Sequence, residues 1–244
     1  MKKLFIGIFY GLVGVLVLFD SVGAQLSAKS LQTDLEKGIR ELSRPVLEKT
    51  LKGCEKLLDA KPEDPGLLYL TAKAHFAMAD YIDINSKEEV DKSGKSGEHI
   101  DTALEIIEEL LDMDAGRLDA WILKYYLLER KITQVGFPKL MAFVGDLRSA
   151  SAKAKALGPD DLRVLLLKAD EAASSMPRPP VAESIAAYDK VLKKAPNMAE
   201  VYYRMGVVYD RAEQSENAGK NYKKAIALDP NHHWAKKRLA MLSE

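Results

Sequence analysis

The sequence predicts an all-α protein, an α-α superhelix in which antiparallel helix pairs stack as a solenoid. First, apolar residues recur at three- and four-residue spacing almost everywhere past residue 26, which is the period of an amphipathic helix. Second, Ala, Leu, Lys and Glu dominate and long β-branched runs are absent, which favours helix. Third, helix-like segments end at Pro159, Pro196 and Pro230, the last two 34 residues apart, and a fixed period of this size indicates stacked repeats.

The clearest repeat covers Ala199 to His232, a stretch of 34 residues. Small residues at Gly206 and Ala218 would let two antiparallel helices approach closely, and Pro230 would end the second helix. This stretch resembles the tetratricopeptide repeat (TPR) family. The positions that carry the resemblance, and that we expect to define the repeat core, are Tyr202, Gly206, Tyr209, Ala218, Tyr222, Ala225 and Pro230, with Met205 beside them.

Looser copies precede this repeat, and together they predict one continuous domain. Stepping back from Pro230, equivalent positions fall at Pro196, Pro159, Ala115 and Pro62, so the spacing grows from 34 to 37, 44 and 53 residues. The excess should lie in turns or in longer helices. The predicted organisation is a helix pair at 25–64 (helices about 28–43 and 45–60), four TPR-like repeats at about 65–115, 116–159, 160–197 and 198–232, and a capping helix at 233–244.

The first 24 residues have the parts of a secretory signal peptide. Lys2 and Lys3 precede 16 uncharged residues, Leu4 to Phe19, and Val22-Gly23-Ala24 follows as a small-residue cleavage site. We expect cleavage after about Ala24 and a periplasmic or secreted body. The alternative is an inner-membrane anchor facing the periplasm, although 16 helical residues rise only about 24 Å against a hydrocarbon core of about 30 Å.

Composition argues against several function classes. Lys+Arg and Asp+Glu are equal at 36 each, so the basic excess of a nucleic-acid binder is missing. One cysteine and four histidines predict no disulfide framework and no metal site. We interpret His75 and Cys54 as packing residues and the His232-His233 pair as a solvated helix start. Because no acid/base constellation stands out, the sequence predicts no catalytic residues, no cofactor and no enzyme.

The resemblance implies a concave groove, lined by the first helices of successive repeats, that holds a peptide or a partner helix. This groove would be aromatic and apolar with a few charges. The alternative, that several of its aromatic residues belong to the core, stays open. The predicted groove residues are Tyr69, Lys73, Phe76, Ile122, Tyr126, Arg130, Tyr203, Val207 and Asp210.

The resulting functional hypothesis is a non-enzymatic scaffold or adaptor of the bacterial envelope that binds another envelope protein and no nucleic acid. The alternative is a periplasmic ligand-binding or transport-accessory helical-repeat protein, which a closed apolar pocket near Tyr69, Phe76 and Tyr126 would favour. Residues 1–24 or the apolar stretch 136–144, which we expect to begin a long second helix, could contact the membrane. Residues 98–119 carry net charge −7 and residues 220–244 carry +4, which allows a head-to-tail association hypothesis.

Overall fold

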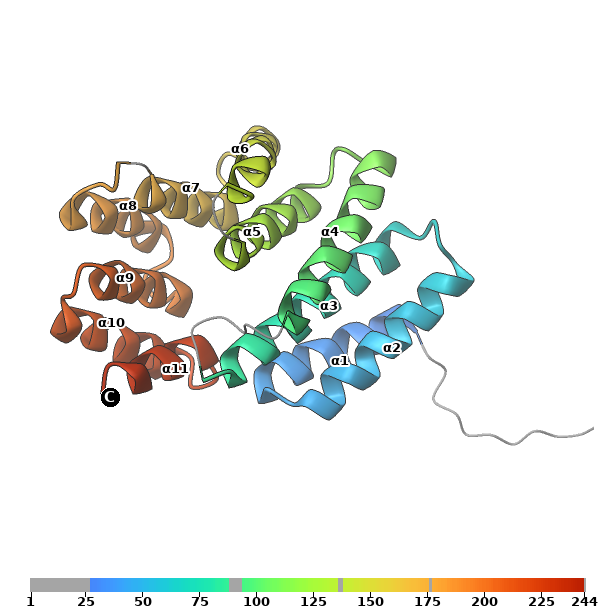
Figure 1. Cartoon of the computed structure of the whole chain (residues 1–244), viewed down its shortest axis with the longest axis horizontal. Coiled ribbons are helices and arrows are strands. Elements are labelled where there is room, and N and C mark those ends of the chain that lie inside the picture. The colour runs from blue at the N-terminus through green and yellow to red at the C-terminus, as the bar shows by residue number, and fades with distance from the viewer. Residues whose placement is uncertain (1–26, 88–93, 136–137, 176, 244) are drawn as a thin grey trace, which may run out of the picture.

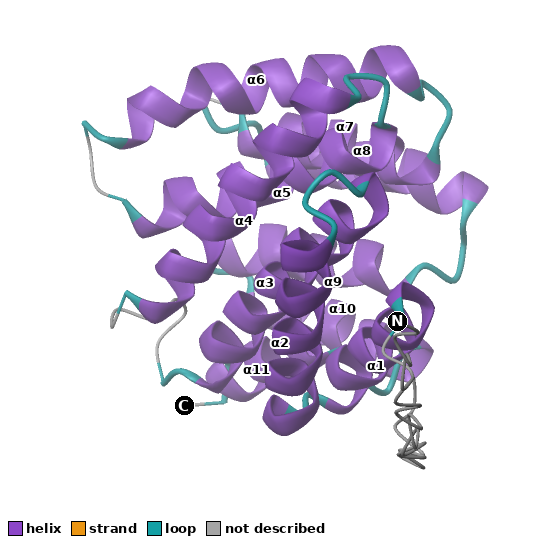
Figure 2. Ribbon diagram, turned by 90° about the vertical axis from the view of Figure 1, so that its right-hand side faces the viewer, coloured by secondary structure: helices purple, strands orange, loops and turns teal. Residues whose placement is uncertain are grey.

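The computed structural model describes residues 27–87, 94–135, 138–175 and 177–243. The predicted signal peptide or anchor at residues 1–24 therefore lies outside the described residues. The described part of the chain is helical with turns between the helices and contains no strand (Figure 2). None of its helices is long and apolar enough to cross a membrane.

The helices form antiparallel pairs that stack side by side (Figure 1), which confirms the predicted all-α helical-repeat superhelix. Their order along the chain is α1 (Ala28–Glu41), α2 (Arg44–Ala60), α3 (Pro65–Asn85), α4 (Lys95–Met113), α5 (Leu118–Gln134), α6 (Leu140–Leu157), α7 (Leu162–Ser174), α8 (Val181–Lys194), α9 (Ala199–Arg211), α10 (Ser215–Leu228) and α11 (His233–Met241).

The extra residues of the N-terminal repeats lie largely in longer helices. Helices α3 and α4 have 21 and 19 residues, whereas α9 and α10 have 13 and 14. Polar residues between these two helices belong partly to the helices themselves. Helix α3 continues through Asn85, and α4 begins at Lys95, directly after Gly94 in the left-handed conformation (φ 86°). Residues 88–93 lie outside the described part.

The helix expected from residue 136 begins four residues later. Helix α6 starts at Leu140, after a turn at Pro138 in which the Pro138 carbonyl accepts from the Met141 amide at 3.0 Å. Met141 is 57% exposed, while Phe143 and Leu147 pack against the core. In the described part of the predicted membrane-contact stretch, Pro138, Met141 and Ala142 are thus exposed, whereas Leu140, Phe143 and Val144 are half-buried.

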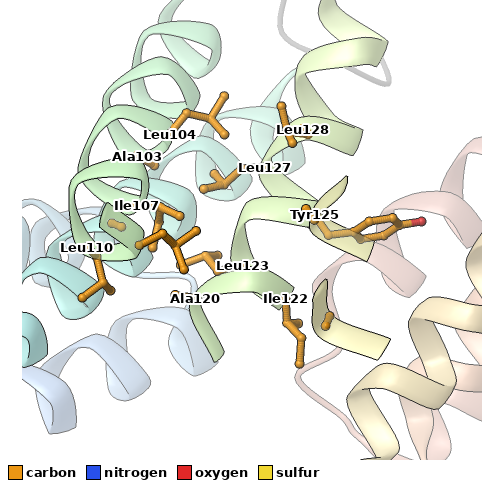
Figure 3. Packing of buried hydrophobic residues seen from close by; sticks show 14 of the residues in the cluster. Ala103, Leu104, Ile107, Leu110, Ala120, Ile122, Leu123, Tyr125, Leu127 and Leu128 are labelled. Carbon is orange, nitrogen blue, oxygen red and sulfur yellow. The ribbon is translucent and has the colours of Figure 1, made fainter. Parts of the chain in front are cut away.

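Apolar side chains fill the space between the two helices of each pair and between neighbouring pairs. The largest cluster joins α3, α4 and α5, where Ile107, Leu110 and Leu127 are completely buried (Figure 3). A separate cluster at the other end of the chain surrounds Tyr222. This division is typical of a solenoid, in which each repeat buries its apolar face against its neighbours.

The stack curves until its two ends meet. Helices α3, α5, α7 and α9 contact one another in turn along the inner side, and α11 contacts α3, so the chain forms a ring (Figure 1). The Lys237 ammonium donates hydrogen bonds to the carbonyl oxygens of Asp83 and Ser86 near the end of α3. The His233 Nε2 donates to the Arg40 carbonyl at 2.9 Å, across 193 residues of sequence. Helix α11 therefore both covers α10 and closes the ring.

Candidate functional site

A cavity of about 330 Å³ lies inside the ring. Its walls come from α3, α5, α7, α8, α9 and α11. The ionisable lining residues balance, since four carboxylates face four guanidiniums. The carboxylates belong to Asp80, Glu129, Asp170 and Glu200, and the guanidiniums belong to Arg130, Arg204, Arg211 and Arg238.

Arg204 on α9 is the centre of the larger charge cluster. Its Nε donates to Glu200 at 2.6 Å, and a terminal nitrogen lies 3.6 Å from Asp170 and 3.8 Å from Glu129. Its guanidinium also lies 5.3 Å from the centre of the Tyr126 ring, within cation–π range. One arginine thus holds carboxylates from α5, α7 and α9, which fixes the relative position of three repeats.

Asp170 on α7 is 2% exposed and is hydrogen-bonded by two tyrosines. The Tyr188 hydroxyl donates to it at 2.7 Å and the Tyr126 hydroxyl at 3.2 Å. Burial raises the pKa of Asp170 to about 6, and the nearby Arg204 opposes this rise. Burial alone would also raise the pKa of Glu200, but Arg204 and His232 overcome that effect and lower the pKa to about 2.

Arg130 on α5 forms the second cluster, at the seam where the ring closes. Its two terminal nitrogens donate to Asp80 at 2.9 Å and to Asp83 at 2.5 Å, both on α3. The guanidinium lies 4.8 Å from the Trp234 ring centre. Trp234 is the second residue of α11, so this cluster joins α3, α5 and α11.

Five of the nine predicted groove residues line this central cavity: Phe76, Tyr126, Arg130, Tyr203 and Val207. The remaining four lie elsewhere. Ile122 is a core residue with 7% exposure, and Tyr69 packs on the core with the Arg117 guanidinium 5.3 Å from its ring. Asp210 accepts from the Tyr222 hydroxyl at 3.1 Å, and Lys73 lines a second cavity.

The expectation of an aromatic and apolar groove with few charges is wrong for this cavity. Sequence reasoning missed the charged residues Asp80, Asp170, Glu200 and Arg204 as well as Trp234. Asp80 follows Phe76 by one helical turn and Arg204 is next to Tyr203, so a search of both flanks of the groove register would have found them. Trp234 carried no such signal, because its place depends on the closure of the ring.

The second cavity, of about 590 Å³, lies between α1, the start of α2, α3 and the turn that leads into α11. Its wall surface is mostly apolar, although charged and polar side chains also line it. Phe76, Asp80, Glu200 and Trp234 line both cavities, so these residues form the partition between them. The apolar wall residues are Ile39, Leu42, Leu47, Phe76, Ala77, Tyr81, Ile84 and Trp234.

His75, His232 and Cys54 are buried, and both histidines contact other side chains of the fold. Burial lowers the pKa of His75 to about 4, and its Nδ1 lies 2.9 Å from His99 Nδ1. Burial raises the pKa of the Cys54 thiol to about 11. His232 is 9% exposed rather than solvated, because its Nδ1 accepts from the Ala235 amide while Nε2 donates to Glu200 at 3.1 Å. Among the described residues, no three His, Cys, Asp or Glu side chains converge as a metal site would require.

The C-terminal repeat has the close helix approach that its small residues predict. Gly206 on α9 faces the ring of Tyr222 on α10 so closely that a Cβ at this glycine would lie 2.4 Å from Tyr222 Cε1. Ala218, Tyr222 and Ala225 are completely buried and Tyr209 packs beside them. The Tyr202 hydroxyl donates to the Pro196 carbonyl at 3.2 Å, and Pro230 lies in the turn between α10 and α11.

Residues 199–232 match the model of the tetratricopeptide repeat family. These residues, which form α9, α10 and the turn after them, are a tetratricopeptide repeat. Among solved structures, TTC0263, a thermophilic TPR protein of Thermus thermophilus, is similar over 87% of this chain and 98% of that chain, with TM-score 0.62 and 15% identity. Human IFIT1, solved as a dimer with m7Gppp-AAAA, is similar over 87% of this chain, with TM-score 0.60 and 14% identity.

This chain spans only 45% of the IFIT1 chain. At such identities the two likenesses show the fold alone. No curated protein matches the sequence. TPR folds generally serve as scaffolds for protein–protein interaction, and that general role is what the family and the fold support for this chain.

Proposed function

We propose that this protein is a non-enzymatic scaffold of the bacterial envelope that holds a segment of a partner protein in its central cavity. The observation that carries the proposal is the lining of that cavity, with four carboxylates, four guanidiniums and the rings of Phe76, Tyr126, Tyr203 and Trp234. A peptide offers amide donors and acceptors, charges of both signs and apolar side chains, so it matches such a lining. The envelope location rests on the signal-like residues 1–24.

The charge balance of the cavity also bears on the class of partner. The formal charges of the lining residues sum to zero, since the four acidic and four basic side chains cancel. A nucleic-acid site needs an excess of positive charge to neutralise phosphates. A protein segment is therefore a better match than a ligand such as the m7Gppp-AAAA of the IFIT1 structure.

Pre-organisation supports binding without any cofactor. Arg204 and Arg130 are fixed by carboxylates from several helices, so their aromatic neighbours are fixed too. A rigid lining loses little conformational entropy when a peptide binds. Only the partner segment would then lose conformational entropy on binding, and its contacts with this preformed surface would supply the affinity.

A ligand-binding or transport-accessory role is the second candidate. The observation that favours it is the closed ring, because α11 contacts α3 and turns an open groove into a cavity. A volume of about 330 Å³ falls at the lower end of the range of small-molecule sites. The experiment below separates the two candidates.

The test is site-specific photocrosslinking in cells. A photoreactive amino acid replaces Thr133 or Ser174, two exposed residues that line the cavity, or Lys190, an exposed control residue on α8 that lies outside the lining. We expect a protein adduct from the two cavity positions and none from Lys190. Equal adducts from all three positions would contradict the proposal. No adduct from the cavity positions, together with a small molecule retained in native mass spectrometry, would favour the second candidate.

A blocking variant gives a matched control. Ser174→Trp should place an indole into the cavity and abolish the protein adduct formed at Thr133, whereas Ser175→Trp, one residue further along and outside the lining, should leave it unchanged. Both serines are exposed, so the helical circular dichroism should be the same in the two variants.

A further inference from the structure

The second cavity differs in chemistry from the central one. Most of its wall surface is apolar and comes from aliphatic and aromatic side chains of α1, α2, α3 and α11, including Leu47 and Ala77, which are almost completely buried. The exposed Ile39 and the half-buried Leu42 also line it. An apolar hollow of about 590 Å³ has the size of a site for a small molecule or a lipid-like chain.

The acidic residues of this cavity already have partners. Asp80 pairs with Arg130, and Glu200 pairs with Arg204 and His232. The two others also accept hydrogen bonds, Glu36 from the Gln32 amide at 3.2 Å and Asp229 from the Asn231 backbone at 2.9 Å. Ion pairs therefore neutralise two of the four acidic side chains, and the other two accept hydrogen bonds from neutral groups.

Two basic residues of the same lining have no such partner. Lys73 on α3 is half-buried and Arg40 on α1 is exposed, and neither forms an ion pair with any residue in the described part of the chain. Because these two cations form no ion pair, they can donate to the head group of an amphipathic anion whose chain lies against the apolar wall.

The apolar walls argue against a peptide in this second cavity. A peptide segment carries an amide donor and a carbonyl acceptor at each residue, and each needs a partner when it is buried. The lining offers few polar groups that are not already engaged. A hydrocarbon chain carries no such groups and needs only apolar walls.

We propose that the second cavity binds a free long-chain carboxylate, with its hydrocarbon chain among Leu42, Leu47, Tyr81 and Ile84 and its carboxylate at Lys73 and Arg40. The ammonium and guanidinium groups donate to the head group, while the burial of the chain supplies most of the affinity. This binding does not depend on the proposed scaffold function, since it uses the other side of the Phe76 and Trp234 partition.

The experiment is a titration of the purified protein with dodecanoate, tetradecanoate and hexadecanoate, followed by calorimetry. Each added methylene should strengthen binding about fourfold until the cavity is full. Hexadecanol, which has the same chain without a charge, should bind about fivefold to tenfold more weakly than hexadecanoate. Absence of saturable binding, or equal affinity for the alcohol and the acid, would overturn the proposal.

A pair of variants locates the head group. Lys73→Met keeps the length and apolar stem of the side chain and should weaken hexadecanoate binding about fivefold to tenfold without changing the affinity for hexadecanol. Lys37→Met, at an exposed position on α1 outside the lining, should change neither affinity. An equal loss in both variants would indicate general charge attraction and would contradict the assignment.

Vesicles distinguish a free acid from a membrane surface. We expect no cosedimentation of the protein with phosphatidylglycerol vesicles beyond that with phosphatidylcholine vesicles, because the proposed site takes one chain and one carboxylate. Cosedimentation with phosphatidylglycerol vesicles that Lys73→Met abolishes would show that the residue serves a lipid surface and would overturn the proposal.

Discussion

Gly206→Ala should destabilise the protein, although alanine is the better helix former. The new Cβ would lie 2.4 Å and 2.5 Å from two ring carbons of Tyr222, whereas relaxed carbon contacts are about 3.5–4.0 Å. The ring must therefore move by about 1 Å. It is completely buried and its hydroxyl donates to Asp210 at 3.1 Å, so it has little room to move.

The magnitude follows from two opposed effects. Overpacking of a filled core costs about 1–3 kcal/mol, and the rigid, tethered ring places this site near the upper value. Replacing glycine by alanine inside a helix gains about 1 kcal/mol. The net loss is about 2 kcal/mol, which corresponds to a fall in Tm of about 4–8 °C for a protein of this size.

Gly219→Ala is the matched control in the same repeat. Its Cβ would meet Leu239 and Leu242 at 3.9 Å, an ordinary contact distance, so only the gain in helix propensity remains. We expect its Tm to rise by about 2–4 °C.

Thermal unfolding followed by far-ultraviolet circular dichroism measures both variants. In a third variant, Tyr222→Leu combined with Gly206→Ala should lose less stability than the sum of the two single changes, because the smaller side chain relieves the clash. The reasoning would be refuted if Gly206→Ala and Gly219→Ala shifted Tm in the same direction.

Three further predictions concern other parts of the fold. Burial holds the pKa of His75 at about 4, so between about pH 6.5 and 4 the unfolded chain binds a proton that the folded chain does not. The free energy of unfolding should therefore fall as the pH drops through this range, and His75→Gln should reduce this pH dependence in urea titrations. Lys237→Met should accelerate amide exchange in α11 about tenfold or more, because the ammonium no longer binds the end of α3; Lys236→Met, at an exposed neighbouring position, should show wild-type exchange, and equal rates in both variants would count against ring closure by this contact. Cys54, completely buried and with its pKa raised to about 11, should react with a thiol reagent only as fast as the chain unfolds, and rapid labelling of the folded protein would contradict the burial.

The helices were predictable because the signal that forms them is local. Apolar residues at helical spacing and the small residues Gly206 and Ala218 report on neighbours within one pair. The groove register was partly readable for the same reason, since Phe76 and Tyr126 occupy comparable turns of successive first helices and both line the central cavity. Local patterns do not, however, separate the wall of a cavity from the core beside it, and Ile122 lies in the core.

The closure of the ring was not predictable in this way. It depends on the angles between successive helix pairs, which add up over the whole stack, and no short stretch of sequence encodes their sum. From the sequence, Trp234 was therefore predicted only as part of the capping helix, although it lies against Arg130 and lines both cavities. The charged lining was missed for a related reason, because Asp170 and Arg204 become partners only when α7 and α9 are adjacent.

Because α11 closes the ring, the walls of both cavities are completed only at the end of protein synthesis. The ribosome makes α11 after all the other helices that line the two cavities. His233, whose side chain contacts the Arg40 carbonyl, is synthesised 193 residues after Arg40. At about 5–20 residues per second this interval lasts about 10–40 s. During that time α1 to α10 can form helix pairs while neither cavity has its complete wall. A nascent chain without α11 lacks part of both walls, so the binding proposed above would begin only after synthesis has passed Trp234.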